Sequence, residues 1–333
     1  KYFLASVILI SVNIYSENLN NKIITAKEIV TLDPVYKNVE AIYIRNNKIH
    51  ALGTYRELVK EFPFAQVDNK HKNHVIVPGF IEHHIHPLLA AITMNSEIVA
   101  IDDWTVLDKK SVGVRTREAY IKKLSGKLTR KNLDSISQDK PILVIHRSFH
   151  EFILNTAALN FFNISAEDLI NLSEEDRKFA NIDEGHFSER GLIAVMPKIM
   201  KYLAEPARII SGLQKTEEYI HKNGITLIAN PGSMYDKNIQ QVKNYVFGDI
   251  DTPFRSLYIP SALYMLENVN FHNLLEKTEE QLLWGSGKVE FLPKHIKLFS
   301  DGAMYSQNMM LRDGYLDGHQ GAWLMEDAVF QET

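Results

Sequence analysis

The chain has 333 residues with 45% hydrophobic and 23% charged side chains, which is typical of a soluble globular protein and excludes a disordered chain. A net charge of −4 and the lack of a long basic cluster argue against nucleic acid as a partner, because the phosphate backbone requires concentrated Lys and Arg. The chain has no cysteine, so disulfides and thiolate ligands are excluded, and any metal must be held by nitrogen and oxygen donors.

Residues 1–20 are predicted to be a signal peptide. After Lys1, an apolar run extends to Tyr15, which is too short for a stable membrane span but typical of a secretory signal. We therefore expect export to the periplasm or the extracellular space. No Ala-x-Ala cleavage pattern follows Ser16, so a buried first strand in a cytoplasmic protein stays an alternative.

Residues 22–75 show the short strands and turns of a small β-domain. The segment AIYIRNNKIHALG, Ala41–Gly53, predicts two strands joined by a turn at Asn46 and Asn47, since Asn tolerates positive φ and the flanking residues are β-branched or aromatic.

The next segment, VIVPGFIEHHIHP from Val75 to Pro87, predicts a buried strand that ends in three histidines. Because side chains alternate along a strand, His84 and His86 face one way and His83 the other. Such an imidazole pair is half of a divalent metal site, with about 2.0–2.1 Å per metal–nitrogen bond. A histidine-rich surface turn is the alternative.

Beyond Pro87, strands and helices alternate as in β/α units with a parallel sheet. The pattern predicts a helix that starts near Ser173 and another over Ala207–Asn223, which Gly224 ends. A further helix is expected over residues 271–283. The predicted strands are ILVIHRS (142–148), ITLIAN (225–230), SLYIPSAL (256–263) and HIKLFS (295–300).

Lys297 lies within the last of these strands, where alternation separates it from Ile296 and Leu298 and directs it inward. Burying an unpaired ammonium costs several kcal/mol, so such a lysine is usually paired, neutral or chemically active. An edge position with the amine reaching water is the alternative. Asp301 is either the ion-pair partner of Lys297 or a separate polar group at the mouth of the site.

These segments resemble a known family. PGFIEHHIHP is similar to the signature PGFIDxHxHP of the amidohydrolase superfamily, and HIKLFSDGAMYSQNMML resembles a region of its YtcJ-like branch, amidohydrolase family 3. HEFILNTAAL (150–159) and GITLIANPG (224–232) resemble further segments of that branch, so the similarity covers most of residues 22–325.

The resemblance implies an α/β fold, a TIM-like (β/α)8 metal-dependent hydrolase barrel over residues 76–333, with its site at the carboxyl ends of the strands. It also implies an incomplete, composite β-sandwich domain over residues 22–75 and a large insertion of about 88–207 after the first strand. The second, third and fourth barrel strands are expected at Gly224–Asn230, Ser256–Leu263 and Ile296–Ser300.

The resemblance also implies roles for single residues. His84 and His86 are expected to hold a divalent metal, Zn²⁺, and Lys297 matches a position where many relatives carry a carboxylated lysine that bridges two metals. Lys297 is therefore expected to act both as a ligand and in catalysis. His150, Asn155 and Asp301 are expected to contact substrate, with a structural role for His150 as the alternative. The implied reaction is hydrolysis of a C–N bond in a small amide, formamide or cyclic amide by a metal-activated water.

The chain also departs from this family. Asn230 stands where relatives often have Asp, Glu82 and His83 replace Asp-Ser, and Val195 stands where a Glu is frequent. The histidines of the fifth and sixth strands and the aspartate of the eighth cannot be placed, so the barrel is expected to be truncated after strand 4. Three interpretations stay open: the N-terminal portion of a hydrolase, an inactive remnant, or a half that needs a separate C-terminal half. An open half-barrel is expected to form oligomers or to aggregate.

Overall fold

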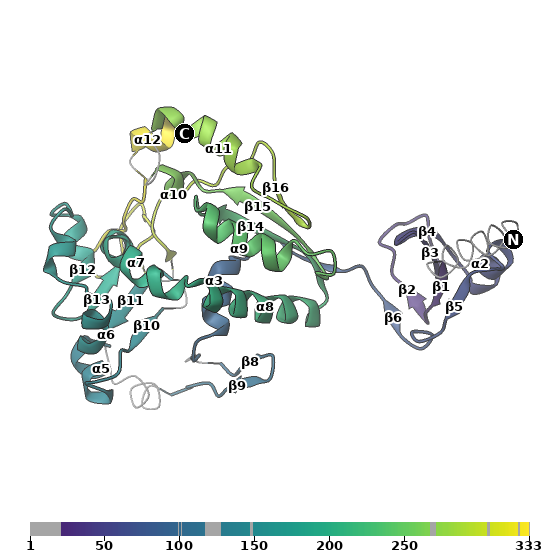
Figure 1. Cartoon of the computed structure of the whole chain (residues 1–333), viewed down its shortest axis with the longest axis horizontal. Coiled ribbons are helices and arrows are strands. Elements are labelled where there is room, and N and C mark those ends of the chain that lie inside the picture. Colours follow the sequence, from purple (N-terminus) through teal and green to yellow (C-terminus); the bar gives the residue numbers. More distant parts are fainter. Residues whose placement is uncertain are drawn as a thin grey trace, which may run out of the picture. The chain divides into compact units, whose positions relative to one another are not determined.

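The computed structural model describes residues 21–98, 100, 102–116, 128–146, 149–266, 271–304, 307–325 and 327–332. The chain divides into two compact units, Lys1–Gly79 and Phe80–Thr333 (Figure 1). The predicted signal peptide of residues 1–20 lies outside the described residues. Within the described ranges, no helix combines the length and the apolar character that crossing a membrane requires.

From Asn21 onward, the part that the structure describes, the first unit contains two small sheets and one helix. Its elements are β1 (Lys22–Thr25), β2 (Glu28–Ile29), β3 (Ala41–Arg45), β4 (Lys48–Gly53), α2 (Tyr55–Glu61), β5 (Gln66–Asp68) and β6 (Val75–Ile76). Strands β4, β3, β1 and β5 form one sheet in that order, and β2 pairs with β6. The predicted β3–β4 hairpin is confirmed: Asn46 and Asn47 have φ of 52° and 59°, and this sign of φ at both turn residues is what a type I′ turn requires.

The second unit is built around a parallel sheet of four strands. In spatial order they are β16 (Val289–Phe291), β15 (Arg255–Pro260), β14 (Ile225–Ser233) and β7 (Phe80–Glu82). Strands β14 and β15 lie where the sequence predicts the second and third strands. The described strands form an open sheet, so the closed eight-stranded barrel stays a prediction.

Two strand predictions need correction. The run after Val75 is two strands, β6 in the first unit and β7 in the second, separated around Pro78. Phe80 and Ile81 are 60% and 63% exposed because β7 is an edge strand that pairs only with β14 among the described strands, so the predicted burial is wrong.

The predicted fourth strand at Ile296–Ser300 is also displaced. The strand next to β15 is the earlier β16, and Lys297 contributes only an isolated parallel bridge to Ser261. Pro293, which has no N–H to donate, and Lys294, with a φ of 59°, interrupt the strand between them.

Helices cover one face of this sheet (Figure 1). They include α3 (Pro87–Met94), α8 (Pro206–Lys222), α9 (Lys237–Phe247) and α11 (Leu274–Leu282). The short α10 (Ala262–Leu266) and the 3₁₀ turn η3 (Phe271–Asn273) precede α11 and contact it. Ile228 and Tyr258 of the sheet share a buried core with Leu213 of α8 and Phe247 of α9. The predicted helix at Ala207–Asn223 is confirmed as α8.

Helix α3 packs directly on α8, although more than a hundred residues separate them in the sequence. An added Cβ at Gly212 would lie 2.3 Å from the carbonyl oxygen of Ala91, so only glycine permits this approach. Helix α3 ends at its C-cap Asn95, and the insertion of about 88–207 stays a prediction.

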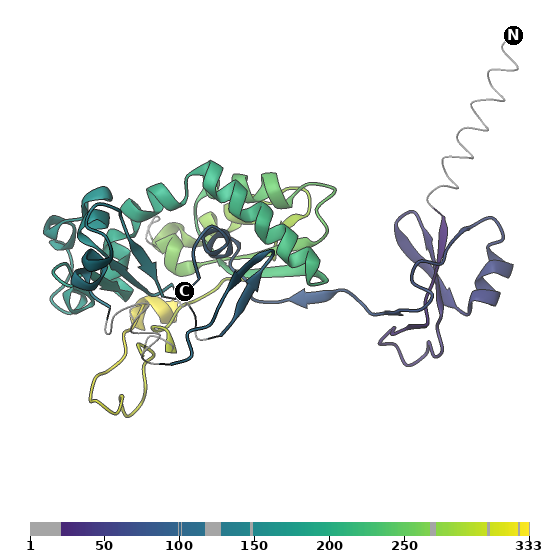
Figure 2. The ribbon, with the colours of Figure 1, turned by 90° about the horizontal axis from the view of Figure 1, so that it is seen from below.

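Between α3 and α8 the chain forms a hairpin and a second, antiparallel sheet. The strands are β8 (Trp104–Val106), β9 (Lys109–Ser111), β10 (Leu143–Ile145), β11 (Glu151–Leu154), β12 (Ala180–Asn181) and β13 (His186–Ser188), with sheet order β10-β11-β13-β12. The helices are α5 (Arg130–Ile136), α6 (Thr156–Phe161), η1 (Ala166–Leu169), η2 (Asp176–Phe179) and α7 (Glu189–Leu203). Residues 307–325 form a long loop, yellow in Figure 2, before α12 (Asp327–Glu332).

Candidate metal centre

The structure brings the two predicted histidine ligands together directly after β7. The ring centroids of His84 and His86 lie 5.1 Å apart, with the rings nearly perpendicular. His84 is exposed and His86 is half-buried, while His83 between them is exposed. The alternation predicted from the sequence therefore yields a neighbouring imidazole pair.

The backbone of His86 is fixed from both sides. Ile85 donates its N–H to Ala229 of β14 at 2.9 Å, which continues the pairing of β7 beyond its last strand residue. His86 is the N-cap of α3, where its carbonyl accepts the N–H of Ala90 at 2.9 Å and Pro87 occupies the first turn.

The imidazole of His86 has a hydrogen-bond partner on the neighbouring strand. Its Nδ1 lies 2.9 Å from Oδ1 of Asn230, which is only 4% exposed. Asn230 is a residue at which this sequence departs from the family pattern. Its contact with His86 was not predicted, because the sequence alone does not show which strand residue faces the histidine.

Electrostatics favour the neutral form of both histidines. Burial lowers the pKa of His86 below its ordinary value, although the hydrogen bond to Asn230 raises it in part. Nearby positive groups including Lys297 lower it further. Although His84 is exposed, partial desolvation of its ring and then the charge of Lys297 also lower its pKa. Neutral imidazole is the form that binds a metal ion.

The charge of Lys297 acts on both imidazoles, and the backbone of Lys297 is held at the end of β15. Its N–H donates to Pro260 at 2.8 Å, and its carbonyl accepts the N–H of Ala262 at 3.0 Å. The side chain is partly buried, with Nζ 5.0 Å from the ring centroid of Phe299.

Asp301 is engaged by the loop that follows it. Its Oδ1 accepts from the hydroxyl of Ser300 at 2.6 Å and its Oδ2 from the N–H of Met310 at 2.9 Å. These contacts give no support to an ion pair between Asp301 and Lys297.

The residues present fit a metal ion in part. Two neutral imidazoles are suitable nitrogen donors, and a four-coordinate site needs further ligands. In the part of the chain that the structure describes, no group of three or more His, Cys, Asp or Glu side chains is arranged to hold an ion. The described residues thus offer half of a donor set.

His150 lies directly before β11 and contacts a carboxylate that was not predicted from the sequence. Its Nδ1 is 2.9 Å from Oε2 of Glu189, whose side chain is 1% exposed. Nδ2 of Asn308 donates to the other oxygen of Glu189 at 2.9 Å. Glu189 begins α7 with a φ of 42°, and neither that conformation nor its burial has a signal in the local sequence.

Asn155 has a structural role where a substrate contact was expected. It is fully buried, and its Oδ1 accepts the N–H groups of Ile142 and Ala158 at 2.9 and 2.8 Å. Its Nδ2 donates to the carbonyls of Ser137 and Lys140. Every hydrogen-bonding position of the side chain is used to cap α6 and fix the preceding loop, so none is available to a substrate.

Lys243 of α9 is a second residue that the sequence analysis missed. It is 2% exposed, with Nζ 3.5 Å from the Ser233 hydroxyl and 4.9 Å from the ring centroid of Tyr258. Burial lowers its pKa to about 8. The sequence does contain an indication of this burial. Gln240, Lys243 and Phe247 are spaced so that they share one buried face of the helix.

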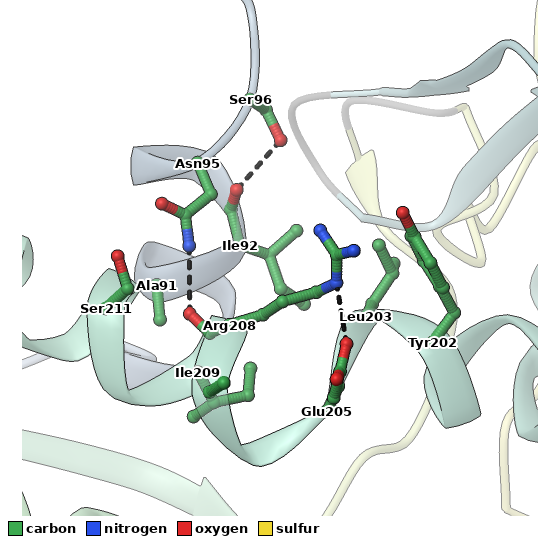
Figure 3. A pocket seen from close by; sticks show the side chains of 11 residues that line it. Ala91, Ile92, Asn95, Ser96, Tyr202, Leu203, Glu205, Arg208, Ile209 and Ser211 are labelled. Atoms are coloured by element: carbon green, nitrogen blue, oxygen red, sulfur yellow. Dashed lines mark hydrogen bonds and ion pairs between the residues drawn. The ribbon is translucent and has the colours of Figure 1, made fainter.

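A hollow of about 600 Å³ lies where α3 ends and α8 begins (Figure 3). Arg208 lines it, with Nε 3.0 Å from the carboxylate of Glu205 and its guanidinium 4.2 Å from the ring centroid of Tyr202. Asn95 donates to the carbonyl of Arg208 at 2.9 Å. None of the predicted metal ligands lines this hollow, so it is separate from the candidate centre.

Comparisons with known proteins support the fold. No protein-family model and no curated protein matches the chain. Among solved structures, it is similar to an uncharacterized metal-dependent hydrolase from Pyrococcus horikoshii OT3, with a TM-score of 0.62 and 18% identity over 92% of this chain and 60% of that one. An uncharacterized metal-dependent hydrolase from Pyrococcus furiosus gives a TM-score of 0.60 and 17% identity over 92% and 62%. The chain spans about three fifths of the length of these structures and shares their mixed α/β fold.

Proposed function

We propose that this chain is part of a metal-dependent amidohydrolase of the YtcJ-like branch, which hydrolyses a C–N bond in a small amide, formamide or cyclic amide. The observation that carries the proposal is the imidazole pair of His84 and His86, fixed after β7 and next to Lys297. The fold shared with solved metal-dependent hydrolases supports the same class.

In this proposal His84 and His86 hold a divalent ion, Zn²⁺, and Lys297 supplies a further oxygen donor after carboxylation of its amine. The ion supplies Lewis-acid chemistry, since it lowers the pKa of a water molecule and polarises a carbonyl group. The residues of the chain hold the proposed ligands in place. The sheet fixes the backbone of the imidazole pair, and Asp301 binds the loop that follows Lys297. His150, which precedes β11 and is paired with Glu189, stays a proposed substrate contact.

In this proposal the ion needs ligands beyond the two imidazoles and Lys297, because a zinc site is usually four-coordinate. The N-terminal portion of a longer hydrolase is the interpretation that we favour. An inactive remnant and a half that needs a separate C-terminal half are the alternatives. We expect residues 1–333 alone to show no amide hydrolysis above a metal-free control. Turnover of an N-acyl or N-formyl substrate by this chain would contradict that expectation.

Metal content tests the ligand assignment. The full-length protein that contains this chain is loaded with Zn²⁺, dialysed and measured by elemental analysis, together with a His84→Ala/His86→Ala variant. His83→Ala is the matched control, because it removes an exposed imidazole between the two. We expect the double variant to lose the bound Zn²⁺ and His83→Ala to retain it. Equal metal content in all three proteins would refute the assignment.

Mass spectrometry of the intact chain in bicarbonate tests the role of Lys297. Carboxylation adds the mass of one CO₂, and Lys297→Ala should abolish this addition. An unmodified amine under these conditions would remove Lys297 from the proposed ligand set.

A further inference from the structure

Asn230 and His86 are brought together by backbone structure before their side chains meet. The hydrogen bond from Ile85 to Ala229 joins the residues that immediately precede each of them. Asn230 is also paired with Tyr258 of β15 on its other side, and the start of α3 fixes His86. The 2.9 Å contact between Oδ1 and Nδ1 is therefore set by the sheet and not by a mobile loop.

The chemistry of this contact determines where the proton of the imidazole lies. A side-chain amide oxygen only accepts hydrogen bonds, so Nδ1 of His86 must donate. Neutral imidazole carries one N–H, which leaves the lone pair on Nε2. An outer partner of this kind fixes both the tautomer and the ring orientation of a ligating histidine.

We propose that Asn230 is a positioning residue of the metal centre, which holds His86 in the Nδ1–H tautomer and makes Nε2 the ligating atom. This inference rests on the proposed function for its metal, but the tautomer itself is a property of the metal-free chain. The amide adds no charge to the site, whereas a carboxylate at this position would stabilise the protonated imidazolium.

Nitrogen NMR of the full chain with ¹⁵N-labelled histidine tests the tautomer. Spectra are recorded without metal at about pH 8, above the ordinary histidine pKa, and the His86 signals are identified by their loss in His86→Gln. We expect a protonated Nδ1 and an unprotonated Nε2 in the wild type and in Asn230→Asp. Asn230→Leu, or the smaller Asn230→Ala if the first does not fold, should give a mixture of tautomers. Protonated Nε2 in the wild type, or an unchanged tautomer without Asn230, would overturn the proposal.

Zn²⁺ affinity tests the positioning role by competition with a chromophoric chelator. Ser256→Ala is the matched control, because it removes a buried polar atom from the adjacent strand that has no hydrogen-bond partner in the described residues. We expect Asn230→Leu to weaken Zn²⁺ binding by about 10- to 100-fold and Ser256→Ala to leave it unchanged. Equal affinities for the wild type and Asn230→Leu would refute the positioning role.

The two proposals fail in different ways. If the wild type binds no Zn²⁺ but shows the Nδ1–H tautomer only while Asn230 is present, the metal centre is wrong and the orientation of His86 by Asn230 stands. If Zn²⁺ depends on His84 and His86 but not on Asn230, the metal centre stands and the positioning role is wrong.

Discussion

Glu189 accepts a hydrogen bond from His150 across 39 positions of sequence, at 2.9 Å and with almost no exposure of its carboxylate. The second oxygen of Glu189 is bonded by Asn308, which lies in the loop after Lys297. One buried carboxylate thus joins the antiparallel sheet to the segment that follows the candidate metal centre. Removing it leaves two polar groups without this partner.

Replacing Glu189 with Ala should therefore destabilise the fold. We expect the free energy of unfolding to fall by about 3 kcal/mol, the magnitude typical of breaking a buried pair from one side. Glu174→Ala, an exposed change in the same insertion, should stay within about 0.5 kcal/mol of the wild type. Urea denaturation measures both, and equal midpoints would show that the buried contact carries no stability.

Asn155→Ala should also destabilise the chain, since it removes four hydrogen bonds to backbone groups and the cap of α6. We expect a loss of about 2 kcal/mol or more. Thr31→Ala serves as the control, because its hydroxyl bonds are exposed. The same denaturation measurement applies, and a stable Asn155→Ala would restore the possibility of a substrate contact.

Lys243 should make stability depend on alkaline pH. Burial lowers its pKa from 10.5 to about 8 in the folded chain, so the unfolded chain binds more protons between these values. Its contribution to stability therefore rises as the pH increases above 8 and is unfavourable by roughly 3 kcal/mol at neutral pH. Lys243→Met should be more stable at pH 7 and lack this rise, unlike the exposed Lys237→Met on the same helix. An unchanged pH profile in Lys243→Met would contradict the buried charge.

The pKa values of His84 and His86 should be shifted in the opposite direction to that of His319. The pKa values of His84 and His86 are lowered, chiefly by burial, whereas hydrogen bonds to the Gln307 carbonyl and to Asp317 raise the pKa of His319. As the pH falls below about 6.5, His84 and His86 are protonated in the unfolded chain before they are protonated in the folded chain. Their contribution to stability therefore decreases. His319 contributes stability at low pH that is lost as the pH rises through its raised pKa. Proton NMR, with signals assigned from His→Gln variants, should place the His86 midpoint below that of His319.

The sequence predicts well what depends on local pattern. The alternation that pairs His84 with His86, the Asn46–Asn47 turn and the amphipathic α8 all follow from spacing within a few residues. It fails where distant segments decide. Asn155 was expected to contact substrate, but three of its four partners lie 13 to 18 residues before it, and these contacts become visible only in the folded chain.

Strand positions show the same limit. Val289–Phe291 is too short to give a pattern, and it becomes a strand because Ser256, Leu257 and Tyr258 pair with it. The burial of Glu189 and the contact between Asn230 and His86 likewise depend on which chain segments become neighbours.

The hydrogen bond from Asn95 to the carbonyl of Arg208 shows that the excursion between α3 and α8 leaves and rejoins the helical layer at adjacent points. Lys215 of α8 holds the same Asn95 side chain at 2.8 Å. A segment anchored in this way is comparable to a domain inserted into a loop, because its two ends lie next to each other. The entropy cost of closing such a loop grows only with the logarithm of its length. The antiparallel sheet next to His150 and Glu189 can therefore diverge, shrink or be exchanged while β7, which precedes His84 and His86, and β14, which contains Asn230, keep their register.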